Sequence, residues 1–369
     1  MARTYKTVTG QALHFLLRPH EGAPRGPIRS EAAWKAADLA RKSDLIVQLD
    51  GAEIAELEAA ARAARATGKP LGALTAADFP LPTFGAKLAR FRRAVSLGVG
   101  VQVMRGVPID RWSVDDSERF FWCFGQHLGT AGAQNRDGEL LGHVRDEGLS
   151  YDDPTVRGYR TSAKLDYHCD AADAVGLLCL RTAKSGGMSR FVSSVTVFNE
   201  LIAARPDLAA RLFEPMAFDS RGDGGVDYFM IAPCRYAGGA LKTFYHADYF
   251  RTAERQPGAP KLSAELRELF DTYDAIASSE DNRFEMELAP GDVQLLSNHT
   301  VLHSRSAYED HAEPEKKRHL LRLWLSFDRP RSLRALPSLG LEAARLLRAL
   351  GAGRLRKRLY GARARASAP

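Results

Sequence analysis

Residues 30 to 97 show the spacing of apolar and polar positions that is typical of amphipathic helices. The segment SEAAWKAADLARKSD begins at Ser30, a residue suited to an N-cap. The segment AEIAELEAAARAARATG is rich in Ala, Glu and Arg and stops at Gly68. The pattern therefore predicts a helical N-terminal region, residues 1–97, packed on the rest of the chain.

From residue 98 the pattern becomes that of short strands with a few helices between them. GVGVQVMRGVPI is rich in β-branched residues, whereas SVDDSERFFWCFGQHLG is typical of a helix with acids in its first turn. After residue 164 short apolar runs are separated by turns: DAVGLLCLRT, SRFVSSV, RFEMEL, DVQLLSN and RHLLRLWLSF. Two predicted helices interrupt them, SVTVFNELIAARPDL and SAELRELFDTYDAIAS, the second with Ser263 as its cap.

This alternation of strands and inserted helices indicates the fold class. Many short strands favour a double-stranded β-helix, or jelly roll, over residues 98–330. Together with the helical N-terminal region, this gives an α+β fold. Residues 215–260 are rich in Gly and aromatic residues and have no clean period. We interpret them as an insertion or as a cover over a site.

Composition and charge narrow the choice of partners. Hydrophobic residues make up 45% of the 369 residues and charged residues 26%, which is ordinary for a globular protein. The net charge is +7, but residues 331–369 hold ten Lys/Arg and one acid, which gives +9 and leaves −2 for residues 1–330. We therefore expect a basic tail, helical or disordered, over 331–369, and no specific nucleic-acid partner.

The sequence also bears on location. No apolar run is long enough to span a bilayer, and the N-terminal segment lacks the features of a secretory signal. The four cysteines form no CxxC pair, which disfavours a zinc ribbon and predicts free thiols. We expect a cytoplasmic protein without a membrane span. The sequence leaves open whether it forms a homo-oligomer.

The segment YHCDAAD carries the first candidate chemistry. On a strand, His168 and Asp170 point the same way, with Cα atoms about 6.6 Å apart, two rises of about 3.3 Å. This spacing suits two ligands of one metal ion. With a distant second histidine, they make the two-histidine, one-carboxylate set of iron(II) oxygenases. His299 and His303, in DVQLLSNHTVLHSRSAYED, are the candidates for that third ligand.

The same cluster admits two other functions. A jelly roll can bind a sugar or another ligand without catalysis. A zinc hydrolase could combine His168 and Asp170 with a third histidine such as His246, given a general base beside a zinc-bound water. Neither alternative explains an arginine placed to bind a dicarboxylate.

Such arginines occur in KRHLLRLWLSF. Read with a period of two, Arg318, Leu320, Arg322 and Trp324 share one face of a strand, and the opposite face is apolar after His319. The arginine face is either solvated or lines a cavity. In a cavity, a guanidinium offers a planar fork suited to bidentate carboxylate binding.

Taken in order, these motifs resemble the taurine-dioxygenase-like (TauD/TfdA) branch of the Fe(II)/2-oxoglutarate oxygenases, near clavaminate synthase and γ-butyrobetaine hydroxylase. The resemblance covers roughly residues 98–327. It rests on the HxD pair, a Gly-Gly turn followed by a hydroxyl residue, an N-x4-H-x-R motif, and an arginine fifteen residues past its histidine. The matching residues here are His168, Asp170, Gly186, Gly187, Ser189, Asn298, His303, Arg305 and Arg318.

The resemblance implies a non-haem iron enzyme that uses Fe(II), 2-oxoglutarate and O2, hydroxylates a small molecule and releases succinate and CO2. By this match His303 rather than His299 joins His168 and Asp170 as a ligand. Ser189 takes the place of the threonine that contacts 2-oxoglutarate, Arg318 holds the distal carboxylate of 2-oxoglutarate, and Asn298 belongs to the cofactor site. Two departures, Ser304 in place of a common glycine and His299 in place of an arginine, leave the subfamily open.

The candidate substrate residues are Arg322, His143 and Tyr167. Arg322 lies four residues beyond Arg318 on the same strand face, so the two Cα atoms are about 13 Å apart. Because 2-oxoglutarate has one distal carboxylate, Arg322 needs another partner, and the resemblance favours a substrate anion. This predicts a small polar substrate that is amino-acid-like or carries a carboxylate, with an internal salt bridge as the alternative. Substrate identity, and the choice between hydroxylation, desaturation and ring formation, stay open.

Overall fold

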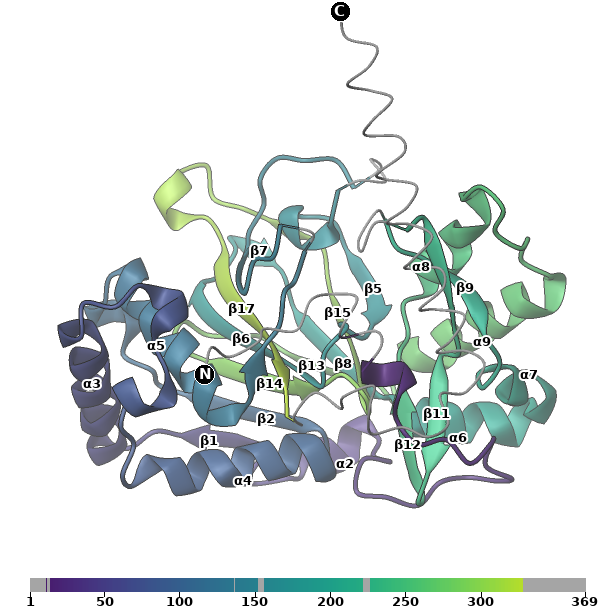
Figure 1. Cartoon of the computed structure of the whole chain (residues 1–369), viewed down its shortest axis with the longest axis horizontal. Coiled ribbons are helices and arrows are strands. Elements are labelled where there is room, and N and C mark those ends of the chain that lie inside the picture. The colour runs from purple at the N-terminus through teal and green to yellow at the C-terminus, as the bar shows by residue number, and fades with distance from the viewer. Residues whose placement is uncertain (1–10, 12–13, 136, 152–155, 222–225, 328–369) are drawn as a thin grey trace, which may run out of the picture.

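A computed structural model describes residues 11, 14–135, 137–151, 156–221 and 226–327 (Figure 1). Its α-helices are α2 (Ala36–Ala40), α3 (Gly51–Ala66), α4 (Phe84–Leu97), α5 (Val114–Leu128), α6 (Ser194–Ala204), α7 (Pro206–Arg211), α8 (Ala247–Thr252) and α9 (Ala264–Ser278). Its strands are β1 (Ile46–Gln48), β2 (Val101–Arg105), β3 (Thr130–Ala131), β4 (Leu141–Val144), β5 (Leu165–His168), β6 (Ala174–Arg181), β7 (Ser185–Gly186), β8 (Ser189–Ser193), β9 (Met216–Asp219), β10 (Tyr228–Ile231), β11 (Cys234–Ala237), β12 (Ala240–Thr243), β13 (Phe284–Met286), β14 (Val293–Ser297), β15 (Val301–Arg305), β16 (Tyr308–Glu309) and β17 (His319–Ser326). The mixture of helices and sheets expected from the sequence is confirmed.

The largest sheet has seven strands in the order β1-β2-β14-β6-β17-β3, with β4 also paired to β17. All its pairings are antiparallel except β1 with β2. A second sheet has four strands in the order β13-β8-β15-β5, and its pairings are antiparallel. In its register, His303 on β15 stands opposite His168 at the end of β5. Two candidate ligands that are 135 residues apart in the sequence are thus neighbours across one ladder.

Helices flank the two sheets on opposite sides. In Figure 1, α3, α4 and α5 lie together on one flank, and α6, α7 and α9 lie on the other. The first group packs its apolar side chains on the outward face of β17, where Leu321, Leu323 and Leu325 are buried with Phe121 and Phe124. The second group packs behind β5, β8 and β15.

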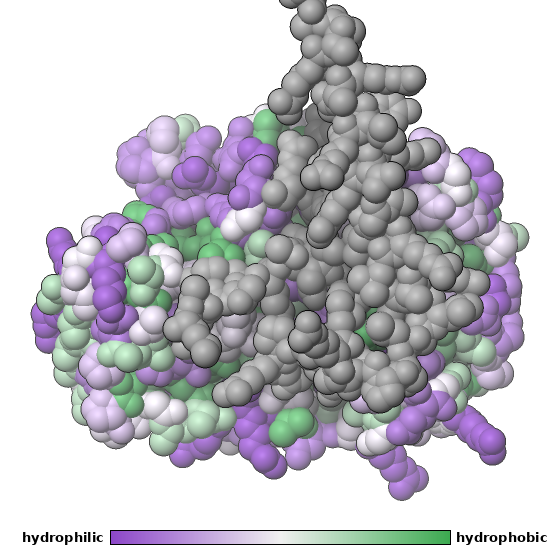
Figure 2. Space-filling model, viewed as in Figure 1, coloured by the Kyte–Doolittle hydropathy of each residue, from purple (hydrophilic) through white to green (hydrophobic). Residues whose placement is uncertain are grey.

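A third apolar cluster includes residues from both sheets. It joins Val101, Val175 and Leu320 of the seven-stranded sheet with Phe191 and Val301 of the four-stranded sheet. Of the large hydrophobic residues that the structure describes, few are exposed: Ile46, Leu97, Val114 and Leu149. Hydrophilic side chains accordingly occupy much of the edge of the face shown in Figure 2.

Several local predictions are confirmed, and some are wrong. The Ser263 hydroxyl accepts a hydrogen bond from the Leu266 amide at the start of α9, as expected. Ser30 is not a helix cap, because α2 begins only at Ala36 and follows Lys35. The N-terminal region is also not purely helical, since β1 adds a parallel edge strand to the main sheet. The tail over 331–369 lies outside the described residues.

Two broader observations concern the whole described part. Its four cysteines are free and buried. No helix among the residues described has the length and apolar character needed to cross a membrane.

Candidate metal centre

Three side chains converge where β5 ends against β15. His168, Asp170 and His303 each offer a ligand atom, and these atoms lie within 4.8 Å of one another. The His303 Nε2 atom is 3.6 Å from Asp170 Oδ2, and the imidazole ring centres of His168 and His303 are 4.3 Å apart. The strand alternation expected for the HxD pair and the β5–β15 register together produce this convergence.

The donor set fits a divalent metal ion. The Asp170 Oδ2 and His303 Nδ1 atoms are buried and have no hydrogen-bond partner. Burial, followed by the neighbouring His168, lowers the pKa of His303 to about 3, so its imidazole is neutral. Burial alone would raise the pKa of Asp170, but Arg322 and the two histidines outweigh it and lower that pKa. A carboxylate beside neutral imidazoles is the ligand chemistry of non-haem iron(II).

Neighbouring groups orient two of these side chains. The His168 Nδ1–H faces the Asp166 carbonyl at 2.8 Å, which leaves Nε2 as the ligand atom. The Asp170 amide donates to Asn298 Oδ1 at 3.1 Å. Asn298 is 1% exposed and lines neither of the cavities described below. Its position favours orienting the loop after β5 over direct cofactor contact.

An inner cavity extends from this cluster between the two sheets. His168 and His303 are at one end, and Ser189, Gln294 and Arg318 also line it. The Ser189 hydroxyl donates to Gln294 Oε1 at 3.1 Å. Arg318 is 7% exposed, its Nη1 has no hydrogen-bond partner, and burial lowers its pKa.

The glycine pair before Ser189 makes room for this arginine. Gly186 and Gly187 both adopt positive φ angles, +76° and +72°, which few residues other than glycine tolerate. A Cβ atom on Gly187 would lie 3.1 Å from Arg318 Nε. The Gly-Gly turn is therefore shaped to the arginine side chain.

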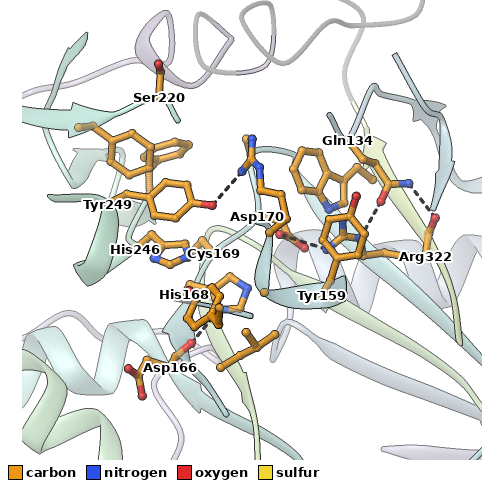
Figure 3. A pocket seen from close by; sticks show the side chains of 18 of the residues that line it. Gln134, Tyr159, Asp166, His168, Cys169, Asp170, Ser220, His246, Tyr249 and Arg322 are labelled. Carbon is orange, nitrogen blue, oxygen red and sulfur yellow. Dashed lines mark hydrogen bonds and ion pairs between the residues drawn. The ribbon is translucent and has the colours of Figure 1, made fainter. Parts of the chain in front are cut away.

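An outer cavity opens on the other side of Asp170. Its walls are largely aromatic: Tyr151, Tyr159, Phe218, Phe229, Phe244, Tyr249 and Trp324. Gln134, Arg157, Ser220, His246 and Arg322 add polar groups. In Figure 3, Tyr249 and His246 lie on one side of Asp170, and Arg322, Gln134 and Tyr159 lie on the other. Residues 215–260 thus supply one wall of the site.

Arg322 borders both cavities. Its Nε donates to Gln134 Oε1 at 2.6 Å, and its Nη1 is 4.0 Å from Asp170 Oδ1. The guanidinium lies 4.4 Å from the ring centre of Tyr159 and 5.2 Å from that of Trp324. It is thus held beside a candidate ligand by a neutral amide and two aromatic rings.

His299 and His246, the other two histidines considered as metal ligands, have different surroundings. His299 Nε2 lies 3.0 Å from Asp173 Oδ1, and His299 lines neither cavity. His246 stacks on Tyr249 with ring centres 3.9 Å apart and lines the outer cavity. Among the described residues, the group that could hold a metal includes His303 and neither of these. The geometry therefore disfavours the zinc site built with His246.

Two residues expected to contact substrate do not line the outer cavity. His143 stands opposite Leu321 on β17, so its side chain is on the outward face, where its Nδ1 is 2.9 Å from His319 Nε2. Tyr167 precedes His168 on β5, and strand alternation turns it away into the apolar cluster behind the sheet. The structure therefore places both side chains away from the outer cavity, Tyr167 because adjacent strand residues face opposite ways and His143 because it lies on the outward face.

The sequence reasoning also missed several residues that line the cavities. Gln294 is a polar residue in the middle of the apolar run DVQLLSN, and that mismatch was a usable signal. Arg305 was noticed as part of the motif but was given no role. Gln134, Tyr159 and Tyr249 come from loops and from the insertion, where no period predicts which way a side chain points.

Comparisons with known proteins agree with this geometry. The sequence profile of the family described as "Taurine catabolism dioxygenase TauD, TfdA family" matches residues 67–324. The chain is 32% identical over 315 residues to FR-33289 synthase of Streptomyces rubellomurinus, covering 83% of this chain and 92% of that protein. It is 30% identical over 197 residues to uridine-5'-phosphate dioxygenase of an Amycolatopsis species, covering 49% and 70% respectively.

Solved structures show the same fold. Asparagine oxygenase, in complex with Fe(II), 3-hydroxyasparagine and succinate, superposes with a TM-score of 0.63 at 18% identity, covering 80% of this chain and 97% of that one. The non-haem iron oxygenase OrfP, with iron, succinate and 3-hydroxyarginine, gives a TM-score of 0.57 at 17% identity, with coverages of 81% and 98%.

Proposed function

The chain belongs to the TauD, TfdA family of taurine catabolism dioxygenases, and from this premise we propose that it hydroxylates a small polar metabolite that carries an anionic group. It is a non-haem iron oxygenase that depends on Fe(II), 2-oxoglutarate and O2. These three together supply the oxidation of a substrate C–H bond, with succinate and CO2 as coproducts. The protein provides binding, orientation and a dry cavity.

One observation carries the proposal: two cavities of different character meet at the His168, Asp170 and His303 cluster. The inner cavity ends at a buried arginine, as a site for a dicarboxylate requires. The outer cavity is aromatic and borders the same cluster, as a site for a second small molecule requires. A metal-bound cosubstrate and a separate substrate therefore each have a place.

The roles of the residues follow from their positions. His168, Asp170 and His303 hold the iron, and Asn298 fixes the loop that carries Asp170. Arg318 and Ser189 hold the distal carboxylate of 2-oxoglutarate in the inner cavity. The two sheets form the proposed jelly roll, and α3 and α4 of the N-terminal region pack on it.

The outer cavity indicates the class of substrate. Its aromatic walls suit a flat or apolar portion, and Arg322 beside Asp170 suits an anionic group. The relatives are named for, or bound to, molecules that carry such groups: uridine-5'-phosphate, hydroxyasparagine and hydroxyarginine. A metabolite with a carboxylate or a similar anion, amino-acid-like in size, fits these features.

Anaerobic titration tests the cosubstrate part. Adding 2-oxoglutarate to the Fe(II)-loaded protein should produce a weak visible charge-transfer band, and a band that fails to form contradicts the proposed inner site. Incubating the enzyme with iron, 2-oxoglutarate, O2 and a fractionated metabolite pool, followed by mass spectrometry, tests the substrate part. A product heavier by one oxygen from an anionic metabolite is expected. A product from an uncharged metabolite alone contradicts the substrate class.

A further inference from the structure

The inner cavity contains a second buried arginine, Arg305, beside Arg318. The two guanidinium carbons lie 4.8 Å and 5.0 Å from the centre of one aromatic ring, that of Tyr308. Arg305 is 6% exposed and Arg318 is 7% exposed. Two cations that line the inner cavity are therefore buried against the same tyrosine.

Neither guanidinium group is held in an ion pair. In the described part of the chain, no ion pair is formed by Arg305 or by Arg318. Asp146 and Asp310 lie near Arg305 and Arg318 but form no ion pair with them. Buried guanidinium donors without partners are unfavourable, so this arrangement is suited to a further anion.

Arg305 is anchored on one edge only. Its Nη2 donates to the carbonyls of Thr161, at 2.8 Å, and of Ala163. Its Nε and Nη1 are buried and have no hydrogen-bond partner. An arginine that served only to hold the loop would use its remaining donors as well, because unsatisfied buried donors are costly. The unused edge is suited to a carboxylate.

The backbone segment that Arg305 Nη2 contacts also borders the outer cavity. The segment 158–163 includes Tyr159, which borders both cavities and stacks against Arg322. A ligand that fixes Arg305 in the inner cavity would therefore also fix the backbone that carries a wall residue of the outer cavity.

We propose that Arg305 and Arg318 together form the receptor for the distal carboxylate of 2-oxoglutarate, and that Arg305 couples this binding to the substrate side through residues 158–163. The inference rests on the proposed function. A carboxylate has two oxygens and about four acceptor positions, so it can accept from both guanidinium groups at once. Arg305 is then a cosubstrate-specificity residue and a positioning residue for the outer wall.

Calorimetric binding tests the receptor in the full-length protein loaded with Mn(II), which binds without turnover. Arg305→Gln should weaken 2-oxoglutarate binding about tenfold to a hundredfold, the worth of hydrogen bonds to a charged group. It should leave binding of 2-oxobutyrate, which lacks the distal carboxylate, and of Mn(II) unchanged. The control is Arg190→Gln, which removes an arginine that is ion-paired with Glu285 at 2.5 Å on the neighbouring strand β8.

The outcomes separate the two proposals. If the wild-type protein binds no 2-oxoglutarate, the proposed function fails and this inference fails with it. If the wild type binds and Arg305→Gln binds within twofold of it, Arg305 only anchors the loop, and this inference alone is overturned.

Hydrogen exchange on the wild-type protein gives a second test, which does not depend on whether the Arg305→Gln variant folds. The amides of residues 158–163 should exchange more slowly when 2-oxoglutarate is added to the Mn(II)-loaded protein, and 2-oxobutyrate should have no such effect. Equal exchange with both ligands, or no protection by 2-oxoglutarate, overturns the coupling.

Discussion

The inner and outer cavities border the same three candidate ligands, but the chain builds them in different ways. The inner cavity is lined mainly from strands of the two sheets, β4, β5, β6, β8, β14, β15 and β17, where alternation fixes the direction of each side chain. The outer cavity takes its walls mainly from loops, the hairpin β9–β10 and helix α8. Strands thus line the proposed 2-oxoglutarate site, and loops shape most of the proposed substrate site.

The largest effect is expected where the two cavities meet. Asp170→Ala should abolish detectable iron-dependent turnover, because it removes the only carboxylate of the ligand cluster. Metal affinity measured by calorimetry, and turnover measured as succinate release, should both be lost while the circular dichroism spectrum is retained.

His299→Ala is the control for that loss. His299 is a nearby histidine whose partner is Asp173, so this variant should keep its iron even though it is less stable. Iron loss in His299→Ala together with iron retention in His303→Ala contradicts the ligand assignment.

The next largest effect should fall on the inner cavity alone. Arg318→Leu should raise the KM for 2-oxoglutarate by two orders of magnitude or more, since breaking a buried charged pair costs about 3–5 kcal/mol. Iron affinity should change little, because Arg318 is outside the ligand cluster. An unchanged KM for 2-oxoglutarate in steady-state assays argues against this role.

A substitution of Arg322 tests whether substrate oxidation can be lost while 2-oxoglutarate decarboxylation is kept. Arg322→Gln should lower substrate oxidation about tenfold or more, the order expected for loss of a charge-assisted hydrogen bond. Decarboxylation of 2-oxoglutarate without substrate should persist, because Arg318 is intact. The readout is the ratio of hydroxylated product to succinate.

The opposite result for Arg322 is also informative. A lower melting temperature with an unchanged substrate KM would show that Arg322 is structural, held by Gln134 and Asp170. The anionic-substrate proposal would then lose its main support.

Two glycine variants test how closely the Gly-Gly turn packs against Arg318. Gly187→Ala should raise the KM for 2-oxoglutarate severalfold, because the new Cβ would press on Arg318 Nε. Gly239→Ala has a similar φ, +77° against +72°, but no atom lies within 4 Å of its Cβ position. Both variants should lose about 1–2 kcal/mol of stability from backbone strain. Equal KM values in the two variants would show that strain alone acts.

The difference between the cavities also explains how much the sequence could predict. Alternation predicts that His168 and Asp170 face the same way and that Arg318 shares a face with Arg322, and the structure agrees with both. The resemblance alone indicates Ser189, which lines the inner cavity. His143 and Tyr167 do not line the outer cavity, because His143 lies on the outward face opposite Leu321 and Tyr167 packs in the apolar cluster behind β5.

What the sequence could not predict is set by tertiary packing. The burial of Gln134 against Arg322 joins residues 188 positions apart, and no local pattern encodes it. The same holds for the placement of Tyr249, which depends on how the insertion folds over the sheet. The proposed substrate site is in this part of the molecule, so the sequence leaves the substrate open.

The smallest effect on turnover is expected for a substitution on the outward face of β17, outside both cavities. There His319 is buried beside His143, with Arg181 Nη2 3.3 Å from its Nδ1. Glu118 and Arg145 are the other charged groups near this pair. Burial, followed by His143 and Arg181, lowers the pKa of His319 to about 4.

The unfolded chain therefore binds more protons than the folded chain between pH 6.5 and about 4. The free energy of unfolding contributed by His319 is complete above pH 6.5, falls as the pH drops through this window, and levels off below about 4. His319→Asn should flatten this slope in urea unfolding measured at several pH values. Because His319 lines neither cavity, the KM for 2-oxoglutarate should stay within twofold of the wild-type value. If the slope of unfolding free energy against pH is unchanged in His319→Asn, other buried histidines, His299 among them, dominate the acid sensitivity. If the KM for 2-oxoglutarate changes greatly, the outward face of β17 and the inner cavity are coupled.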